Sequence, residues 1–296
     1  MSGNPLKNVY LKLFHFGIFN FIPDKAFLKI QYRAATGKKL NLKDPKSYNE
    51  KMQWIKLYDH NPLYTILADK LAVRGYVKEK VGEEYLIPLL GHWNSINDIE
   101  YNKLGNQFVL KTNHDSGGIV ICSNMTSFDK VAAEKKLTEH MNQNHFYMSR
   151  EWAYKDVKPC IIAEKYMIDD EANDLRDFKF FCFNGEPKIV QVDFDRFINH
   201  RRNIYDMDWN LLDVTIKCPN DKNVKIDCPS NFDEMVQIAR KLSAGLPEAR
   251  IDLYSVNGKT YFGEVTLYHG NGYEKFTPDS FGDVMGSWID LSLCGE

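Results

Sequence analysis

Two acidic residues, Asp252 and Glu264, lie near the C-terminal end of the chain in neighbouring segments that could bring their carboxylates together. Polar and apolar residues alternate in residues 249–255 and 260–267, which is typical of strands with one buried face. Carboxylates held close together repel each other unless a cation lies between them. Oxygen ligands of this kind suit Mg²⁺, which proteins usually bind through one or two carboxylates together with substrate phosphates. The pattern therefore indicates a magnesium site, provided that the two side chains share a face.

The register of this predicted hairpin decides whether they do. A two-residue turn at Asn257-Gly258 would pair Asp252 with Gly263 and would turn Glu264 to the apolar side. A three-residue loop that also includes Val256 would place both carboxylates on one face as diagonal neighbours, roughly 7–8 Å apart at the backbone. We expect the three-residue loop, because it puts all the polar groups on the same face. The open alternative is a plain surface hairpin held by an arginine–glutamate pair.

The second feature is an apolar strand that ends at Lys111 and continues into the small loop 113–118, which contains two glycines. Such an arrangement can bring an ammonium group and backbone N–H groups onto phosphates, although the GxxxxGK[ST] spacing of a P-loop is absent. Another predicted strand, residues 161–167, carries an adjacent acid and base, Glu164 and Lys165. Each motif is common when taken alone, so their order along the chain is more informative than any one of them.

The elements that must position these residues fall into two groups. Apolar residues recur every three or four positions through the first 60 residues, which predicts helices, and Ser47 followed by Glu50 has the form of a capping box. After about residue 85, short strands and Asn-Gly hairpins dominate. Helices followed by antiparallel hairpins predict an α+β fold. Further helices are predicted over 63–81, 127–144 and 232–244, and further strands over 85–90, 108–111, 159–167, 177–183 and 187–194.

The composition limits the classes of function. The chain has 296 residues, enough for one or two domains, and its 38 basic and 40 acidic residues argue against a nucleic-acid binder held by bulk charge. Six cysteines without a CxxC pair do not make a disulfide framework or a structural zinc site, so reduced thiols in a cytoplasm are expected. The apolar run 13–22 is shorter than the roughly 20 residues of a membrane span. An amphipathic helix at a membrane surface and a core-facing helix both remain open.

Taken together, these motifs resemble the ATP-grasp superfamily, and within it the TupA-like branch that is found with polysaccharide biosynthesis. Residues 47–54 and 68–74 resemble signatures of this branch, and the resemblance extends over about residues 47–291. It implies an ATP-grasp fold, in which two α+β subdomains with antiparallel sheets clasp ATP. The implied division of the chain is a helical N-terminal region (1–65), a helix and strand leading into the core (66–106), a lid subdomain (107–165) and a C-terminal subdomain with the metal site (166–296).

The resemblance implies ATP as the nucleotide and assigns it a set of binding residues. Lysines and the glycine loop would hold the phosphates, the strand that contains Glu164 would hydrogen-bond the adenine, and an aspartate would take the ribose hydroxyls. The implied ATP-binding residues are Lys70, Lys111, Ser116, Gly117, Gly118, Glu164, Lys165, Tyr166, Met167 and Asp177.

The resemblance also implies Mg²⁺, with Asp252, Glu264 and Thr266 as its ligands. Thr266 stands where the family usually has an asparagine. Arg250 and Lys111 would act as catalytic residues by stabilising the transferring phosphoryl group. The implied reaction is amide ligation, in which ATP phosphorylates a carboxylate and an amine then displaces the phosphate. We expect it to join an amino acid to a sugar, a uronic acid or an amino sugar, of a cell-surface polysaccharide.

The acceptor site is the part that the resemblance does not supply. Arg196, in a basic stretch with His200, Arg201 and Arg202, is the best candidate because a guanidinium fork matches a carboxylate. Two alternatives stay open: a kinase that phosphorylates a glycan, and a non-catalytic nucleotide-binding scaffold of a glycan assembly complex. We expect a cytoplasmic enzyme without a nucleic-acid partner, at the inner face of the membrane if the N-terminal helix makes a peripheral contact. The oligomeric state is open.

Overall fold

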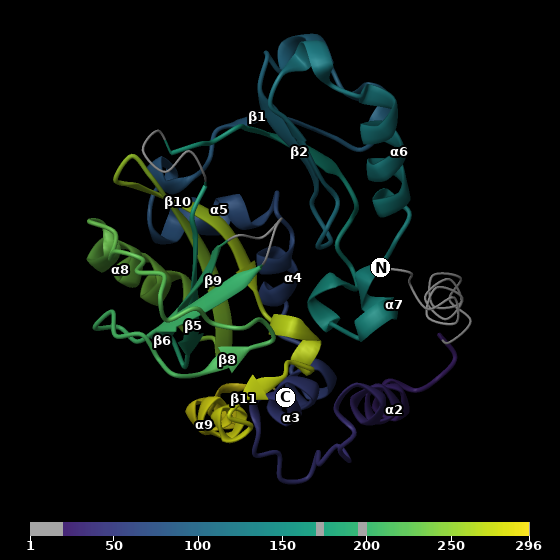
Figure 1. Cartoon of the computed structure of the whole chain (residues 1–296). Helices are drawn as coiled ribbons and strands as arrows, with labels where there is room; N and C mark the ends of the chain where they lie inside the picture. The colour runs from purple at the N-terminus through teal and green to yellow at the C-terminus, as the bar shows by residue number, and fades with distance from the viewer. Residues whose placement is uncertain (1–19, 170–174, 195–199, 296) are drawn as a thin grey trace.

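The computed structural model describes residues 20–169, 175–194 and 200–295, and in this part of the chain helices, two larger antiparallel sheets and a small two-stranded one form the predicted α+β fold (Figure 1). The helices are α2 (Asp24–Thr36), α3 (Tyr48–Tyr58), α4 (Leu63–Ala68), α5 (Val73–Lys80), α6 (Lys130–Met141), α7 (His145–Ser149), α8 (Phe232–Ser243) and α9 (Ser280–Trp288). The strands are β1 (Leu89–Trp93), β2 (Phe108–Thr112), β3 (Ile119–Cys122), β4 (Ile161–Lys165), β5 (Asp177–Phe183), β6 (Glu186–Phe194), β7 (Arg201–Tyr205), β8 (Thr215–Ile216), β9 (Glu248–Val256), β10 (Lys259–Thr266) and β11 (Phe276–Thr277).

A five-stranded sheet, in the order β10-β9-β5-β6-β7, forms the larger half of the molecule. Helix α8 covers one of its faces, because Met235, Ile238 and Leu242 recur at helical spacing and are all buried. Apolar residues of the central strands, such as Phe180 opposite Ile251, meet this helix in the core. The alternate residues of the same strands point to the other face of the sheet, which carries Lys179, Arg250 and Asp252 together with the buried Phe181 and Phe183. This polar face is turned away from α8 (Figure 1).

The smaller sheet has the order β1-β4-β2-β3 and carries α6 on its outer side (Figure 1). It has a core of its own, in which Leu137 of α6 is buried with Phe108, Leu110 and Ile161 of the strands. Strand β1 was expected over residues 85–90 but begins at Leu89, because the preceding residues form a short 3-10 turn. Two sheets with separate cores can enclose a cleft between them.

The N-terminal helices pack against the C-terminal end of the chain. The predicted capping box is confirmed: the Ser47 side chain accepts from the backbone N–H of Glu50, whose carboxylate accepts from the N–H of Ser47. Helix α3 contacts α9, and its Tyr48 is fully buried beside Phe276. The predicted hairpins at Asn184-Gly185 and Asn257-Gly258 and the predicted helix α8 are confirmed as well.

The single helix predicted over 63–81 is wrong, because the chain leaves the helix at Asp69 and starts a new one at Val73. The Asp69 carboxylate accepts from the backbone N–H of Leu71 at 2.8 Å and from the Asn113 side-chain amide at 2.8 Å. A short acidic side chain that bonds its own backbone in this way competes with the helix. At the break, the backbone N–H of Lys70 donates to the carbonyl of Asn113. The interruption of the helix therefore places Lys70 next to the glycine loop.

Candidate functional site

The polar face of the five-stranded sheet carries a compact group of charged residues on three neighbouring strands. Asp177 and Lys179 come from β5, Arg250 and Asp252 from β9, and Glu264 from β10. Asp252 lies opposite Lys179 on one side and opposite Glu264 on the other. All five residues are buried except Glu264, whose side chain keeps 40% of its exposure. The structure therefore brings together four residues that the sequence singled out, and adds Lys179.

The expected three-residue loop is wrong, although its consequence holds. The turn has two residues, Asn257 and Gly258, both with positive φ (53° and 74°) as a type I′ turn requires. This register alone would turn Glu264 toward the core, but a β-bulge at Gly263 advances the strand by one residue. Glu264 thus lies directly opposite Asp252 rather than diagonal to it, and Arg250 lies opposite Thr266. A β-carbon at position 263 would come within 3.0 Å of the Asp252 carbonyl, so glycine suits the bulge.

Arg250 is the centre of this group. Its Nε and Nη2 donate to the two carboxylate oxygens of Asp252 at 2.6 and 2.7 Å, and Nη2 also donates to Glu264 at 3.2 Å. Its Nη1 lies 2.6 Å from Nδ1 of His269. Because arginine can only donate, Nδ1 must accept and the proton of His269 is on Nε2, 3.7 Å from the Glu274 carboxylate. Burial and the charge of Arg250 hold the pKa of His269 well below its usual value, so the imidazole stays neutral.

The charges of the group stabilise one another. Burial disfavours the ammonium form of Lys179, but Asp177 and Asp252, both in contact with it, outweigh burial and raise its pKa. Burial likewise disfavours the ionised form of Glu264, but Lys70, Arg250 and Lys179 outweigh it and lower its pKa to about 2. Glu264 therefore remains a carboxylate at every physiological pH. A ligand that binds at neutral pH therefore meets cations and carboxylates that are already ionised and already oriented.

A second set of charges lies on the smaller sheet and on α5. Lys111 Nζ on β2 donates to Glu164 of β4 at 2.6 Å, and Arg74 Nη1 of α5 donates to the other oxygen of Glu164 at 3.1 Å. A narrow pocket between the sheets is lined by both sides: Lys70, Arg74, Lys111, Ile162, Glu164, Phe262 and Gly263. Of the residues that the resemblance assigned to phosphates and adenine, Lys70, Lys111 and Glu164 thus share one pocket, against the strand that carries Glu264.

The glycine loop between β2 and β3 is held from three directions. Lys70 Nζ donates to the Asp115 carbonyl at 2.5 Å, and the Asp115 carboxylate contacts both Thr112 and His140. Gly117 has a φ of 126°, and a β-carbon at Gly118 would collide with Thr112. Gly117 is therefore favoured by its backbone conformation and Gly118 by the close approach of the Thr112 side chain, and Ser116 and Gly117 remain exposed at the loop tip. The loop is anchored at its base and accessible at its tip.

The remaining predicted residues lie in several places. Lys165 is exposed, and Tyr166 and Met167 continue the chain beyond β4 with part of their surface accessible. Thr266 donates to Glu264 at 3.2 Å, so its hydroxyl lies beside the two carboxylates. Arg196 falls outside the described residues. Of its neighbours, Arg202 lies in β7, and its Nε donates to the buried Asp193 at 2.7 Å. This guanidinium therefore belongs to an internal ion pair that stabilises the fold.

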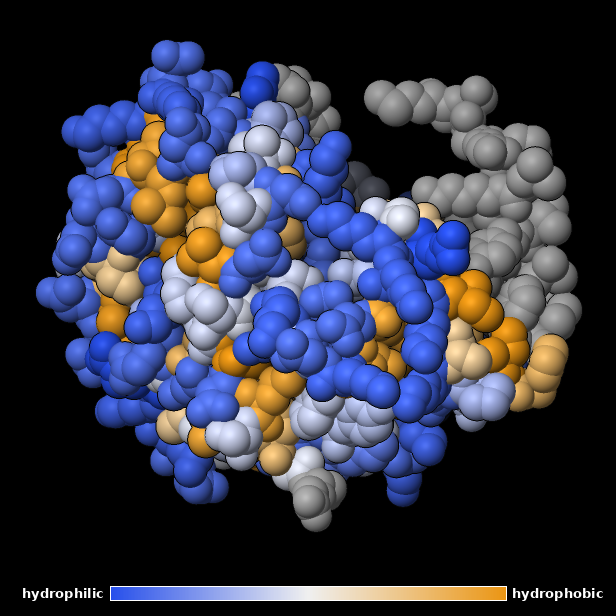
Figure 2. Space-filling view, turned by 90° about the horizontal axis from the view of Figure 1, so that it is seen from below, coloured by the Kyte–Doolittle hydropathy of each residue, from blue (hydrophilic) through white to orange (hydrophobic). Residues whose placement is uncertain are grey.

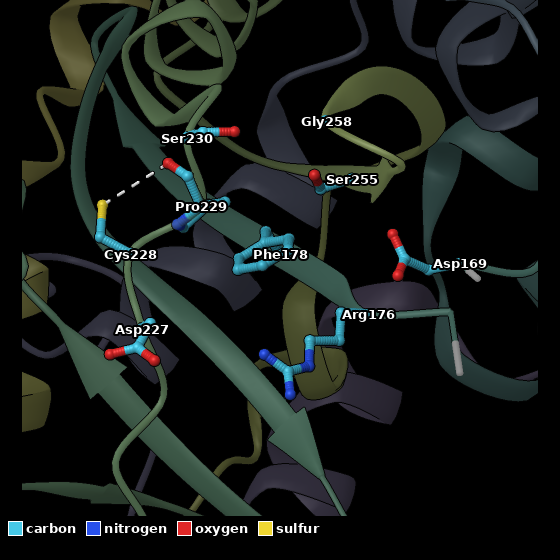
Figure 3. A pocket seen from close by; sticks show the side chains of 9 residues that line it. All are labelled: Asp169, Arg176, Phe178, Asp227, Cys228, Pro229, Ser230, Ser255 and Gly258. Atoms are coloured by element: carbon cyan, nitrogen blue, oxygen red, sulfur yellow. Dashed lines mark hydrogen bonds between the residues drawn. The ribbon is translucent and has the colours of Figure 1, made fainter. Parts of the chain in front are cut away.

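Another pocket, of about 340 Å³, lies near the β9–β10 turn (Figure 3). Arg176 and Asp227 lie on either side of Phe178 in this view. Phe178 and Ser255 point to the face of the sheet opposite to Asp177 and Asp252, since they alternate with them along β5 and β9. The sheet therefore separates this pocket from the charged group, and we do not include it in the site.

The donor set fits a divalent cation that shares its coordination with phosphates. Asp252 and Glu264 present carboxylate oxygens from directly opposite positions, with the Thr266 hydroxyl next to them. Within the described residues, no cluster of three or more His, Cys, Asp or Glu side chains could hold a metal ion. Proteins usually bind Mg²⁺ through one or two carboxylates, and the substrate phosphates supply further ligands.

Sequence reasoning missed three residues of the site. Lys179 follows Asp177 by two positions in a predicted strand, so the alternation of strand residues could have placed it on the same face. Arg74 lies in α5 one turn beyond Lys70, and its contact with Glu164 spans 90 positions in sequence. His269 follows β10 and meets Arg250 only because the 3-10 turn His269–Gly272 folds back onto the sheet. No local pattern indicates these two contacts.

One buried carboxylate beside the site should make the stability of the fold depend on pH. Glu248 lies on the same face as Arg250, with one oxygen accepting from Tyr48 at 2.9 Å and the other without a hydrogen-bond partner among the described residues. Burial raises the pKa of Glu248 from 4.5 to about 8. The folded state thus binds a proton that the unfolded state releases, so stability should fall as pH rises from about 5 to 8 and then level off.

We expect Glu248→Gln to remove much of this dependence. At pH 8 the variant should be more stable than the parent by roughly 2–4 kcal/mol, because the amide needs no proton to stay neutral. Denaturant unfolding at pH 5.5 and pH 8 measures it. The same change at half-exposed Glu186 is the control. Parallel pH dependence of the parent and Glu248→Gln would contradict the assignment.

Comparison with known proteins reveals what this arrangement is similar to. A model of the family described as TupA-like ATPgrasp matches residues 50–290. Similar solved structures include D-alanine–D-alanine ligase from Bacillus anthracis complexed with ATP (15% sequence identity, TM-score 0.45, 76% of this chain and 63% of that chain). They also include the ADP complex of purK, N5-carboxyaminoimidazole ribonucleotide synthetase (12%, TM-score 0.43, 70% and 46%). The chain spans less than two thirds of the length of either structure. No curated protein matches the chain.

Among the described residues, no helix combines the length and the apolar character that crossing a membrane requires.

Proposed function

The chain belongs to the TupA-like ATP-grasp family and has the ATP-grasp fold, and from this premise we propose that it is an ATP-dependent carboxylate–amine ligase. The observation that supports this most directly is the cleft itself. Lys70, Lys111 and Glu164 line a pocket whose opposite wall is formed by Phe262 and Gly263 of β10, and Glu264, the next residue of that strand, pairs with Asp252 of the charged group. Such a site can neutralise a triphosphate and a carboxylate at the same time.

The proposed reaction has two steps. A carboxylate oxygen of the first substrate attacks the γ-phosphorus of ATP, and the bond between this phosphorus and the oxygen of the β-phosphate breaks. ADP departs, and the first substrate has become an acyl phosphate. The amine of the second substrate then attacks the acyl carbon and inorganic phosphate departs, with the amine proton released. The carboxylate is a modest nucleophile, so catalysis must come from positioning and from cancelling negative charge.

The residues of the cleft would divide this work. Lys111 would exchange Glu164 for a phosphate oxygen, and Lys70 would stay beside the glycine loop that it already contacts. Arg250, held in one orientation by Asp252 and His269, would stabilise the transferring phosphoryl group. Mg²⁺, when held by Asp252 and Glu264, supplies positive charge to the phosphate oxygens. The glycine loop would exclude water from the acyl phosphate.

We further propose the substrates from the branch to which the chain belongs. An amino acid would be joined to a uronic acid or amino sugar of a cell-surface polysaccharide, and Arg196 would bind the acceptor carboxylate. Ser116, Gly117 and Gly118 would close over the phosphates, Glu164 to Met167 would bind adenine, Asp177 would serve the ribose, and Thr266 would assist the metal. Because the reaction consumes ATP, it would take place in the cytoplasm.

A matrix of amino acids and uronic or amino sugars, each with ATP and Mg²⁺, tests the function. We expect ADP release that depends on both a carboxylate and an amine, one inorganic phosphate per ADP, and an amide product by mass spectrometry. A phosphoester without free phosphate would instead identify a kinase. ADP release that no acceptor stimulates would contradict the ligase, and Mg·ATP binding without any turnover would instead identify the nucleotide-binding scaffold.

A further inference from the structure

Helix α2 and the segment after it carry a cluster of cations that no ion pair within the described residues neutralises. The acidic residues of this stretch are already engaged, since Asp24 pairs with Arg150 at 2.8 Å and Asp44 with Lys46 at 2.6 Å. Lys38 is likewise paired, with Asp279. The cations left over are all exposed: Lys25, Lys29, Arg33, Lys39 and Lys43. Net positive charge is concentrated here in a chain whose overall charge is −2.

An apolar groove of about 280 Å³ runs through the middle of this basic cluster. Ile30 and Leu40 line it together with Lys29, Arg33 and Lys39. Ile30 is 59% exposed although it sits in the centre of the helix. Seen from below, hydrophobic side chains gather at the edge of the molecule where α2 lies, among hydrophilic ones (Figure 2). Long cationic side chains around an apolar floor can lay their stems on it and direct their charges outward.

The helix is fixed to the body of the protein, so within the described residues this face points outward. Phe27, Leu28 and Tyr32 on its other side are buried in a small core of their own. Arg150, itself buried, lies over the ring of Phe27 and pairs with Asp24. Phe21, just before the helix, is 80% exposed. Apolar and cationic groups therefore share one outward face that the rest of the described chain leaves uncovered.

We propose that this face, formed by Phe21, Lys25, Lys29, Ile30, Arg33 and Lys39, docks the protein on an anionic membrane surface. Basic residues attract acidic headgroups, and neighbouring apolar side chains enter the boundary between headgroups and acyl chains. Charge complementarity selects an anionic partner, and the exposed Phe21 and Ile30 favour a lipid surface over a nucleic acid or an acidic polymer, which would offer them nothing apolar. The inference does not depend on the ligase reaction.

Vesicle sedimentation of the full chain tests it, with phosphatidylcholine alone and with phosphatidylcholine containing phosphatidylglycerol. We expect binding to the anionic vesicles only, and loss of binding in high salt. The triple variant K29Q/R33Q/K39Q should bind about 100-fold more weakly, at roughly fivefold for each cation removed. Ile30→Glu should weaken binding too, while all variants keep Mg·ATP binding because the face lies outside the cleft.

The matched control is K135Q/K188Q/K241Q, which removes the same charge from exposed lysines elsewhere; it should bind as the parent does. Equal loss in both triple variants would show that bulk charge is responsible and would overturn the proposal. Equal binding to neutral vesicles, or binding to polygalacturonate but not to anionic vesicles, would overturn it as well, the latter in favour of an acidic polymer.

Discussion

Replacing Glu264 with glutamine is expected to reduce turnover by about a thousandfold while leaving the fold intact. The side chain is the one member of the charged group that retains substantial exposure, and its carboxylate makes only one contact with Arg250, at 3.2 Å. An amide of the same size keeps the packing but loses the charge that a divalent cation needs. Losing one preorganised electrostatic contact to the reacting phosphates typically costs two to three orders of magnitude in rate.

This prediction can be measured without knowing the acceptor. Calorimetric titration with ADP should show that Mg²⁺ tightens binding to the parent but not to Glu264→Gln, and Glu186→Gln should behave as the parent does. Asp252→Asn should fail in the same assay and also unfold more readily, by about 3 kcal/mol, because it leaves Arg250 and Lys179 buried beside a neutral group. Mg²⁺-dependent tightening that survives in Glu264→Gln would disprove the metal assignment.

Arg250→Lys is expected to lower kcat for ADP release by about 100-fold to 1000-fold, although it conserves the charge. A lysine has no rigid fork, so it cannot hold both oxygens of Asp252 while also reaching Glu264 and His269. The positive charge would remain near the phosphates without its fixed orientation. The KM for ATP should change much less than kcat, because in the proposed site Lys70 and Lys111 hold the nucleotide independently of Arg250.

Steady-state kinetics with the acceptor pair found by the matrix measures this effect. Arg240→Lys is the matched control, because Arg240 also contacts a carboxylate through its guanidinium but does so at the exposed Glu186. It should leave both activity and unfolding close to those of the parent. An Arg250→Lys variant with parental kcat would show that orientation of the guanidinium does not matter.

Much of the local structure could be predicted because it depends on interactions between residues close in sequence. The Ser47 capping box, helix α8 and the two Asn-Gly hairpins each follow from side chains a few positions apart, and the structure confirms them. The α+β class follows from their order. Prediction failed where a side chain competes with the regular pattern, as Asp69 does when it ends α4.

The β9–β10 hairpin could not be predicted fully from residues close in sequence. The sequence indicated that Asp252 and Glu264 should share a face, but it could not choose between a longer loop and a tight turn followed by a bulge. The tertiary structure decided for the bulge at Gly263, because burial of Val265 beside Ile251 is satisfied only if one residue is left out of the pairing.

The types and order of the chemical residues, and so the expectation of a phosphate and magnesium site, are determined by the sequence alone. Whether these side chains come into contact is decided by the packing of the two sheets and the N-terminal helices. Arg74 reaches Glu164, Lys179 reaches Asp252 and His269 reaches Arg250 across separations of 90, 73 and 19 residues. Contacts over such distances form only when the cores have closed, because the free energy that holds them comes from burial and not from any neighbouring residue along the chain.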